Sequence, residues 1–226
     1  MKLFFPLMLF CSTLVAEDVP KWAQMQSAIL VQPDLTKVKN LVEGGVDPNA
    51  PIGCGTYAPL NGAIQKQNVE LVALLLSMGA KPTEEQMVQA AFGSGHQEAL
   101  QIVKSLHAAG ASVNSREYYS GDKGRFTMPL HQAVWRHNTE LVAYLLKQKG
   151  IELNELNISG CTPLMTAVEH GREDVVSMLL NAGADPLKRN TAGLDAISVA
   201  NQVIETQTRL KTKLSSPNAL GATGVE

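Results

Sequence analysis

Residues 161–176, CTPLMTAVEHGREDVV, bring together side chains that could bind a metal ion or carry out acid–base chemistry. Cys161 and His170 are potential metal ligands, and three carboxylates lie within the same sixteen positions. A catalytic constellation is needed once in a chain, whereas a structural pattern can recur. This pattern does recur, as MPLHQAVWRHNTELVAYLL from Met128 and as APLNGAIQKQNVELVALLL from Ala58. We therefore expect the cluster to be mainly scaffold.

The other short motifs that could carry chemistry are incomplete. His131 and His137 point in different directions from one predicted helix, and no His-Glu-x-x-His or Cys-x-x-Cys pair is present to hold zinc. Gly93-Ser94-Gly95 lacks the wider Gly-x-Ser-x-Gly pattern and falls between two predicted helices. No glycine-rich phosphate loop occurs. The sequence predicts no catalytic residues, no metal site and no cofactor, so we do not expect an enzyme.

The composition is that of one folded, soluble body. Of the 226 residues, 45% are hydrophobic and 18% are charged, which is enough apolar content for a substantial core. The chain carries 19 basic and 21 acidic residues, a net charge of −2. This balance offers nothing for bulk binding to nucleic acid, so no nucleic-acid partner is expected.

Residues 1–16 have the layout of a secretory signal peptide, with Lys2, an apolar run over residues 3–10 and the small Ala16 before two acids. Its removal takes Lys2 away and leaves 18 basic against 21 acidic residues, a net charge of −3. We predict a periplasmic (or secreted) protein with no stable membrane insertion after cleavage.

A pair of side chains four residues apart marks the second helix of each repeated unit. The steps between the second members of these pairs are 34, 31, 39 and 34 residues. A glycine follows each pair and can adopt the left-handed backbone that ends a helix. The pairs are Val38/Val42, Val72/Leu76, Val103/His107, Val142/Leu146 and Val176/Leu180.

Each unit has about 33 residues, with a turn and two helices. Its first helix opens with Thr-Pro-Leu at Thr162 or with Pro-Leu-His at Pro129. This pattern resembles the ankyrin repeat. The resemblance covers about residues 22–200. It implies an all-α fold, an ankyrin-repeat solenoid of about five helix-turn-helix units with terminal capping helices. We predict the ankyrin-repeat domain over residues 20–210 and a flexible C-terminal tail over residues 211–226.

Several local features follow from this register. We expect the Thr162 hydroxyl to cap its helix, whereas Met128 cannot cap the equivalent one. The third unit lacks Thr-Pro-Leu and is expected to enter its helix at Thr83. By the resemblance, His131 forms a hydrogen bond between neighbouring repeats. The fourth loop before a helix, residues 115–127, is longer than its neighbours.

Cys54 and Cys161 remain after the predicted cleavage, in an oxidising compartment where disulfides form. The resemblance places them three repeats apart. Because stacked helices lie about 8 to 10 Å apart, the two thiols are expected to be roughly 25 to 30 Å apart and unpaired.

Ankyrin-repeat proteins generally bind partners through their loop tips, called fingers, and the exposed ends of the first helices. By that resemblance we predict a partner-binding surface made of Tyr57, Lys66, Arg116, Tyr118, Tyr119, Arg125, Trp135, Arg136, Ile158, Glu169 and His170. Trp135 and Arg136 stand out because the scaffold needs no large ring there. An alternative for Tyr118 and Tyr119 is that they pack the long finger onto the stack.

Residues 115–136 hold four basic side chains against two acidic ones, a local charge of +2 that favours a protein partner with an acidic patch. The sequence thus predicts a non-catalytic interaction module, monomeric alone, that binds a partner in the periplasm in a protective or inhibitory role. Two alternatives stay open: an immunity protein that neutralises a toxin, and a secreted effector that acts on host proteins.

Overall fold

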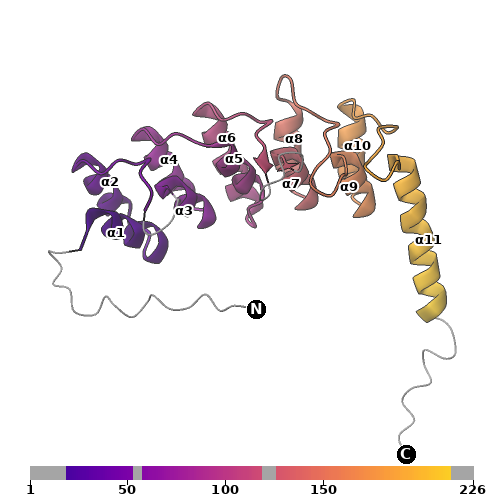
Figure 1. Cartoon of the computed structure of the whole chain (residues 1–226), viewed down its shortest axis with the longest axis horizontal. Coiled ribbons are helices and arrows are strands. Elements are labelled where there is room, and N and C mark those ends of the chain that lie inside the picture. Colours follow the sequence, from indigo (N-terminus) through magenta and orange to yellow (C-terminus); the bar gives the residue numbers. More distant parts are fainter. Residues whose placement is uncertain (1–18, 53–57, 119–125, 215–226) are drawn as a thin grey trace, which may run out of the picture. The chain divides into compact units, whose positions relative to one another are not determined.

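The computed structural model describes residues 19–52, 58–118 and 126–214. Two compact units divide the chain, residues 1–82 (unit 1) and residues 83–226 (unit 2). Within each unit, helices adjacent in the sequence form hairpins that pack side by side (Figure 1). The described residues contain five such hairpins and a final helix, which confirms the predicted all-α class.

Unit 1 contains two hairpins. In the first, α1 runs directly into a π-helical turn, η1, before α2; α3 and α4 form the second. Gly62 of α3 lies so close to η1 that an added Cβ would come within 2.7 Å of the Ile29 side chain, so a small residue is needed there. The elements are α1 (Lys21–Gln26), η1 (Ser27–Val31), α2 (Leu35–Glu43), α3 (Pro59–Gln65) and α4 (Val69–Ser77).

Unit 2 contains three hairpins and a long last helix. The first helices of the hairpins, α5, α7 and α9, pack on one another and form an inner row that α11 closes; α6, α8 and α10 pack behind them (Figure 1). The helices are α5 (Glu84–Ala91), α6 (His96–Ala108), α7 (Pro129–Trp135), α8 (Thr139–Leu146), α9 (Pro163–Glu169), α10 (Glu173–Asn181) and α11 (Ala196–Leu214). We call the loops before the inner helices the finger end and the turns after them the turn end.

Helix starts follow the expected chemistry. The Thr162 hydroxyl accepts a hydrogen bond from the Met165 N–H at 3.2 Å, as predicted. Thr83 caps α5 and forms a capping box with Gln86, so the third unit begins where the sequence placed it. Met128 cannot cap α7, but its side chain is completely buried. The lost cap at this position therefore coincides with a gain in core packing.

The first members of the aligned pairs lie in the core in four of the five repeats: Val38, Val72, Val103 and Val142 are fully buried. The second members lie toward the edge of the apolar stripe. Leu180 is 44% exposed, whereas Leu179, the residue before it, is fully buried. The buried band is wider than one row of side chains, because each helix packs on more than one neighbour.

Asparagine side chains connect consecutive fingers. The Asn114 amide donates to the Gly150 carbonyl at 2.8 Å, and its oxygen accepts from the Glu152 N–H at 3.1 Å. Asn49 makes the same two kinds of bond within unit 1. Each asparagine satisfies two backbone groups of the following loop, and so fixes the distance between adjacent fingers.

The long finger contains the described strands, β1 (Glu117–Tyr118) and β2 (Phe126–Thr127), which pair antiparallel with Glu117 opposite Thr127. Residues 119–125 between them lie outside the described residues. At the other end of unit 2, α11 continues to Leu214, a few residues past the predicted boundary at 210. The predicted signal segment, residues 1–16, and residues 215–226 of the predicted tail also lie outside the described residues.

Candidate functional site

The turn end of unit 2 brings the last residues of the inner helices to one level. Phe92 is the C-cap of α5, Arg136 is the C-cap of α7 after Trp135, and His170 is the C-cap of α9 after Glu169. These positions are equivalent in the repeat and form no part of the buried core. Their side chains can therefore differ between repeats without disturbing the fold.

Phe92, Trp135 and Arg136 form one aromatic–cation cluster. The Phe92 and Trp135 rings stack with centroids 5.5 Å apart and planes 16° apart. The Arg136 guanidinium carbon lies 4.0 Å from the centroid of Phe92 and 5.1 Å from that of Trp135. Both rings stay solvent-accessible, at 43% for Phe92 and 46% for Trp135. The cluster is an ordered, half-exposed aromatic surface with a cation on it.

One edge of the Arg136 guanidinium is held and the other is open. Its Nε donates to the Phe92 carbonyl at 2.8 Å, which fixes the plane of the group over the ring. None of the ion pairs among the described residues includes Arg136. Among the described residues no carboxylate pairs with its two terminal nitrogens, which form a pair of parallel donors, the geometry that suits a carboxylate.

A cavity of about 160 Å³ lies beside the cluster. Phe92 and Trp135 form its apolar wall, and the Gln132 amide, bonded to the Thr127 hydroxyl at 3.2 Å, forms part of its polar wall. The complete lining is Phe92, Thr127, His131, Gln132, Trp135, Asn157 and Thr166. The cavity thus reaches from the turn end toward the finger end along the inner row.

The finger end has a different arginine arrangement. Arg116 lies over the Phe126 ring at 4.7 Å, and its Nη2 is 2.7 Å from a Glu152 carboxylate oxygen and 3.6 Å from one of Glu155. The Tyr118 ring is 5.7 Å from that of Phe126 and is half exposed. Because Glu152 and Glu155 neutralise Arg116, the local surplus of +2 counted over residues 115–136 is corrected: this cation is not free.

Residues 87–190 match the family model described as ankyrin repeats, in three copies. This part of the chain consists of ankyrin repeats, and the described residues have the fold of an ankyrin-repeat protein. The ankyrin repeat domain of Bcl-3, a member of the IkappaB family, superposes with a TM-score of 0.63 at 23% identity, over 82% of this chain and 85% of that one. The ankyrin repeat protein EF0377 superposes with a TM-score of 0.66 at 21% identity, over 85% and 98%. At these identities the two structures establish the fold.

Curated relatives share only part of their length with this ankyrin-repeat protein. The ANK repeat-containing protein nipk-1 of Caenorhabditis elegans is 36% identical over 42% of this chain and 17% of its own. The NF-kappa-B p105 subunit of Gallus gallus is 35% identical over 40% and 9%. Zygote-specific protein 3 of Chlamydomonas reinhardtii is 33% identical over 63% and 37%. Ankyrin repeats generally mediate protein–protein contacts.

The structure places the predicted binding residues of the ankyrin array in several locations. Trp135 and Arg136 meet in the cluster, with Phe92, which the sequence analysis missed. Glu169 and His170 are exposed at the turn after α9, and Ile158 is half-buried in the finger before α9. Lys66 is exposed at the end of α3 in unit 1. Arg116 and Tyr118 belong to the finger end. Tyr57, Tyr119 and Arg125 lie outside the described residues.

A signal for Phe92 was present in the sequence. Gly93-Ser94-Gly95 follows it as the turn between α5 and α6, just as a turn follows Arg136. Alignment on the turns, rather than on the absent Thr-Pro-Leu, puts Phe92 at the position of Arg136.

His131 has the structural role that the resemblance implied. Its Nε2 is 3.0 Å from the Glu155 carbonyl oxygen in the next finger, and the residue is 2% exposed. Burial lowers the pKa of its imidazole from 6.5 to about 4. The ring is neutral at physiological pH and connects two repeats, so it is not available for acid–base chemistry.

Other candidates for chemistry give no constellation in the described ranges. No group of three or more histidine, cysteine, aspartate or glutamate side chains there could hold a metal ion. Burial, and then the charge of Glu169, raise the pKa of the Cys161 thiol, so it is a weak nucleophile. Cys54 lies outside the described residues, and its pairing stays a prediction. None of the described helices is long and apolar enough to cross a membrane.

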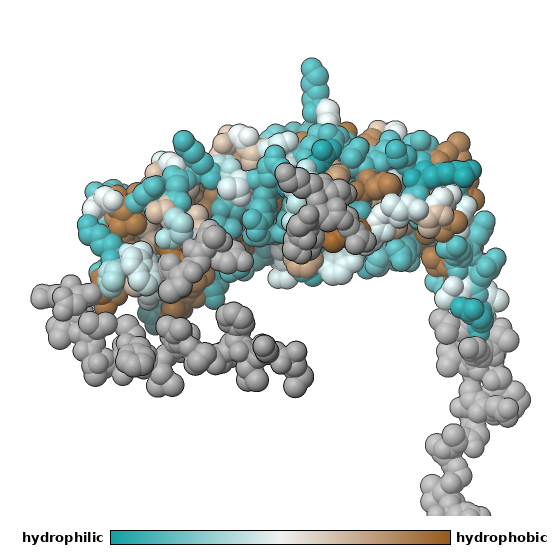
Figure 2. Space-filling model, viewed as in Figure 1, coloured by the Kyte–Doolittle hydropathy of each residue, from teal (hydrophilic) through white to brown (hydrophobic). Residues whose placement is uncertain are grey.

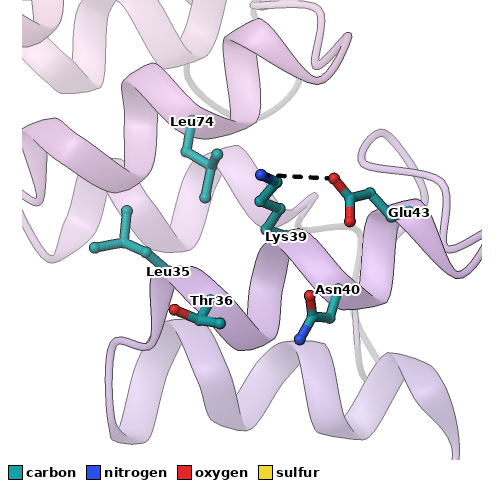
Figure 3. Close-up of a pocket in the computed structure, with 6 residues that line it drawn as sticks. All are labelled: Leu35, Thr36, Lys39, Asn40, Glu43 and Leu74. Atoms are coloured by element: carbon teal, nitrogen blue, oxygen red, sulfur yellow. Dashed lines mark ion pairs between the residues drawn. The ribbon is translucent and has the colours of Figure 1, made fainter.

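Two further hollows are open to the surface. One, of about 440 Å³, lies between α9 and α11 and includes Cys161 and Val203. The other, of about 350 Å³ in unit 1, lies between α2 and α4, where Lys39 pairs with Glu43 at 3.8 Å beside Leu74 (Figure 3). On the visible face of unit 2, apolar patches are separate and interspersed with polar side chains (Figure 2). The aromatic–cation cluster is the most specific feature of the described surface.

Proposed function

We propose that this ankyrin-repeat protein is a non-catalytic binding module whose main contact is the aromatic–cation cluster of unit 2. The observation that carries the proposal is the half-exposed Phe92–Trp135 stack under an arginine that has no carboxylate partner among the described residues. Tryptophan and arginine are enriched among residues that dominate binding energy, because tryptophan offers a large rigid area and arginine offers directed donors. The ankyrin family's use as a protein-binding scaffold supports the same function.

The partner we propose is a protein with an acidic patch. Arg136 supports this, because its open edge presents two parallel donors and its ring contacts hold it in place. Arg116 does not add to the attraction, since Glu152 and Glu155 already pair with it. The charge argument therefore rests on Arg136 rather than on the whole of residues 115–136.

The place of action we propose is the periplasm, after removal of residues 1–16. Lys2, the apolar run that follows it and Ala16 support this proposal. Intact-mass measurement of protein recovered from the periplasm is the test. A chain that begins after Ala16 supports export, and a chain that begins at Met1 contradicts it.

The binding test compares the mature chain with the double variant Trp135→Ala, Arg136→Ala, each immobilised and exposed to periplasmic extract. A partner captured by the unaltered chain should be almost absent from the variant, because loss of one such anchor costs about 2 kcal/mol or more, roughly thirtyfold in affinity. The matched control is Glu169→Ala, His170→Ala, at equivalent positions of the next repeat, which should retain most of the capture. Circular dichroism should show both variants folded.

Equal capture by the double variant and the unaltered chain would place the interface elsewhere. Unfolding of the double variant would mean that Trp135 supports the core. Since its ring stacks on Phe92, we expect a loss of only about 1 kcal/mol in the free energy of unfolding.

A further inference from the structure

The turn end of unit 2 offers two adjacent and different features to a ligand. One is the open edge of Arg136, and the other is the 160 Å³ cavity whose apolar wall is Phe92 and Trp135. The Arg136 guanidinium carbon and the Trp135 ring centroid are only 5.1 Å apart. A ligand that uses both features must carry an anionic group and an apolar group at close spacing.

Both features lie within the reach of one extended peptide. In an extended chain, side chains at positions i and i+2 point to the same side and are about 6.5 to 7 Å apart. One can therefore contact Arg136 while the other enters the cavity. The small size of the cavity, together with the separate apolar patches on the visible face, gives little area for a broad apolar contact with a folded surface (Figure 2).

The charges along the inner row favour the turn end over the finger end as the place where an acidic side chain of the ligand binds. At the finger end, Glu85 and Glu117 lie near each other, and Gln89 donates to Glu85 at 2.7 Å. Burial, and then the charge of Glu85, raise the pKa of Glu117, because two neighbouring carboxylates disfavour each other's charged form. These carboxylates repel an acidic side chain and direct it to the Arg136 end.

We propose that the partner reaches this surface as an extended segment that sets a carboxylate on the open edge of Arg136 and places an apolar side chain, two residues away, in the cavity beside Trp135. The inference rests on the proposed function, since it takes the aromatic–cation cluster as the contact. It goes further in naming the ligand: a linear acidic-x-apolar peptide. A carboxylate fits better than a phosphate, because one arginine with a single free edge supplies little charge for a dianion.

The experiment titrates the mature chain with the peptide acetyl-Gly-Ser-Asp-Ser-Leu-Ser-Gly-amide and with its reversed core, Leu-Ser-Asp, by isothermal titration calorimetry. At least one order should bind. Replacement of the peptide aspartate by asparagine, or Arg136→Ala in the protein, should then weaken binding at least about tenfold. Arg136→Lys, which keeps the charge but not the paired donors, should lose most of the same affinity. The matched control Arg116→Ala should change affinity less than about twofold.

Several outcomes overturn the inference. These are no binding by either peptide, an asparagine peptide that binds as well as the aspartate peptide, or an Arg136→Ala protein that binds normally. A phosphoserine peptide that binds about tenfold more tightly than the aspartate peptide would show a phosphate site instead.

A competition experiment separates this inference from the proposed function. If the Trp135→Ala, Arg136→Ala variant loses a captured partner that the aspartate peptide does not displace, the binding function stands and the linear-peptide inference is wrong. If capture is unaffected by the double variant and no peptide binds, both are wrong.

Discussion

In unit 2 an arginine lies over a phenylalanine at the finger end and again at the turn end, and the two pairs have different neighbours. At the finger end, Arg116 lies over Phe126 and pairs with Glu152 and Glu155 from the next repeat. At the turn end, Arg136 lies over Phe92 and pairs with no carboxylate among the described residues. The same local contact therefore includes a paired cation in one place and, in the other, a cation without a carboxylate partner among the described residues.

The difference extends to the residues around each arginine. The finger end contains asparagine bridges, the buried His131 and the close approach of consecutive loops. The turn end has half-exposed rings and turns with open space around them. Substitutions at the finger end should therefore change stability, whereas substitutions at the turn end should change binding. The following predictions test that division, from the largest expected effect to the smallest.

His131 should make the finger end sensitive to acid. The pKa of its imidazole is about 4 in the folded protein against an ordinary value of 6.5, so below pH 6.5 the unfolded chain takes up a proton that the folded chain does not. Stability should fall by about 3 kcal/mol as the pH decreases from about 6.5 to about 4. Urea unfolding at a series of pH values measures this.

The control for that prediction is His131→Gln, which removes the titrating group but keeps a hydrogen-bonding side chain. The variant should lack the part of the pH dependence between 4 and 6.5. If it does not fold, NMR titration of His131 in the unaltered protein decides the matter. A pKa near 6.5 in the folded state would contradict the prediction.

Arg136→Ala should reduce affinity for the captured partner roughly thirtyfold, about 2 kcal/mol, whereas Arg116→Ala should change it less than about twofold. The reason is that only Arg136 has donors left for a partner. Surface plasmon resonance with the isolated partner measures both constants. A comparable loss for a folded Arg116→Ala protein would remove the distinction between the two arginines.

A matched pair of glycines tests how tightly the two ends are packed. Gly160 in a finger has φ +73°, and a Cβ there would overlap the Thr191 side chain; Gly171 in a turn has φ +63° and no atom within 4 Å of an added Cβ. Gly171→Ala should cost about 1 kcal/mol for its left-handed backbone alone. Gly160→Ala should cost about 2 kcal/mol or more, because the overlap adds to the same backbone strain. Equal losses in chemical unfolding would show that the ends are equally open.

The smallest expected effect is a difference in salt dependence: high salt should reduce the stability cost of losing Arg116 but not that of losing Arg136. Arg116→Ala should lower the free energy of unfolding by about 1 kcal/mol in low salt and by less than about half of that in 1 M NaCl, because salt screens the partly exposed ion pairs. The cost of Arg136→Ala should hardly change with salt, since it loses ring contacts and a backbone hydrogen bond. A cost for Arg136→Ala that disappears in high salt would reveal a carboxylate partner.

Trp135 and Arg136 were predictable from the sequence, because helix periodicity places the end of an inner helix toward solvent. Phe92 was not predicted, because the third repeat lacks the Thr-Pro-Leu that marks the start of an inner helix. The pairing of Arg116 was not predictable either. Glu152 and Glu155 lie 36 and 39 residues further along the chain, and no local pattern connects them to Arg116.

The sequence by itself determined the repeat period, the helix starts at Thr83 and Thr162 and the position of the turns. These depend on interactions within a few residues, such as a hydroxyl that caps the N–H three positions later. The tertiary structure alone decided which charges are satisfied and which rings meet. Phe92 and Trp135 come from neighbouring repeats, as do Arg116 and its glutamates, so each contact exists only when one hairpin stacks on the next.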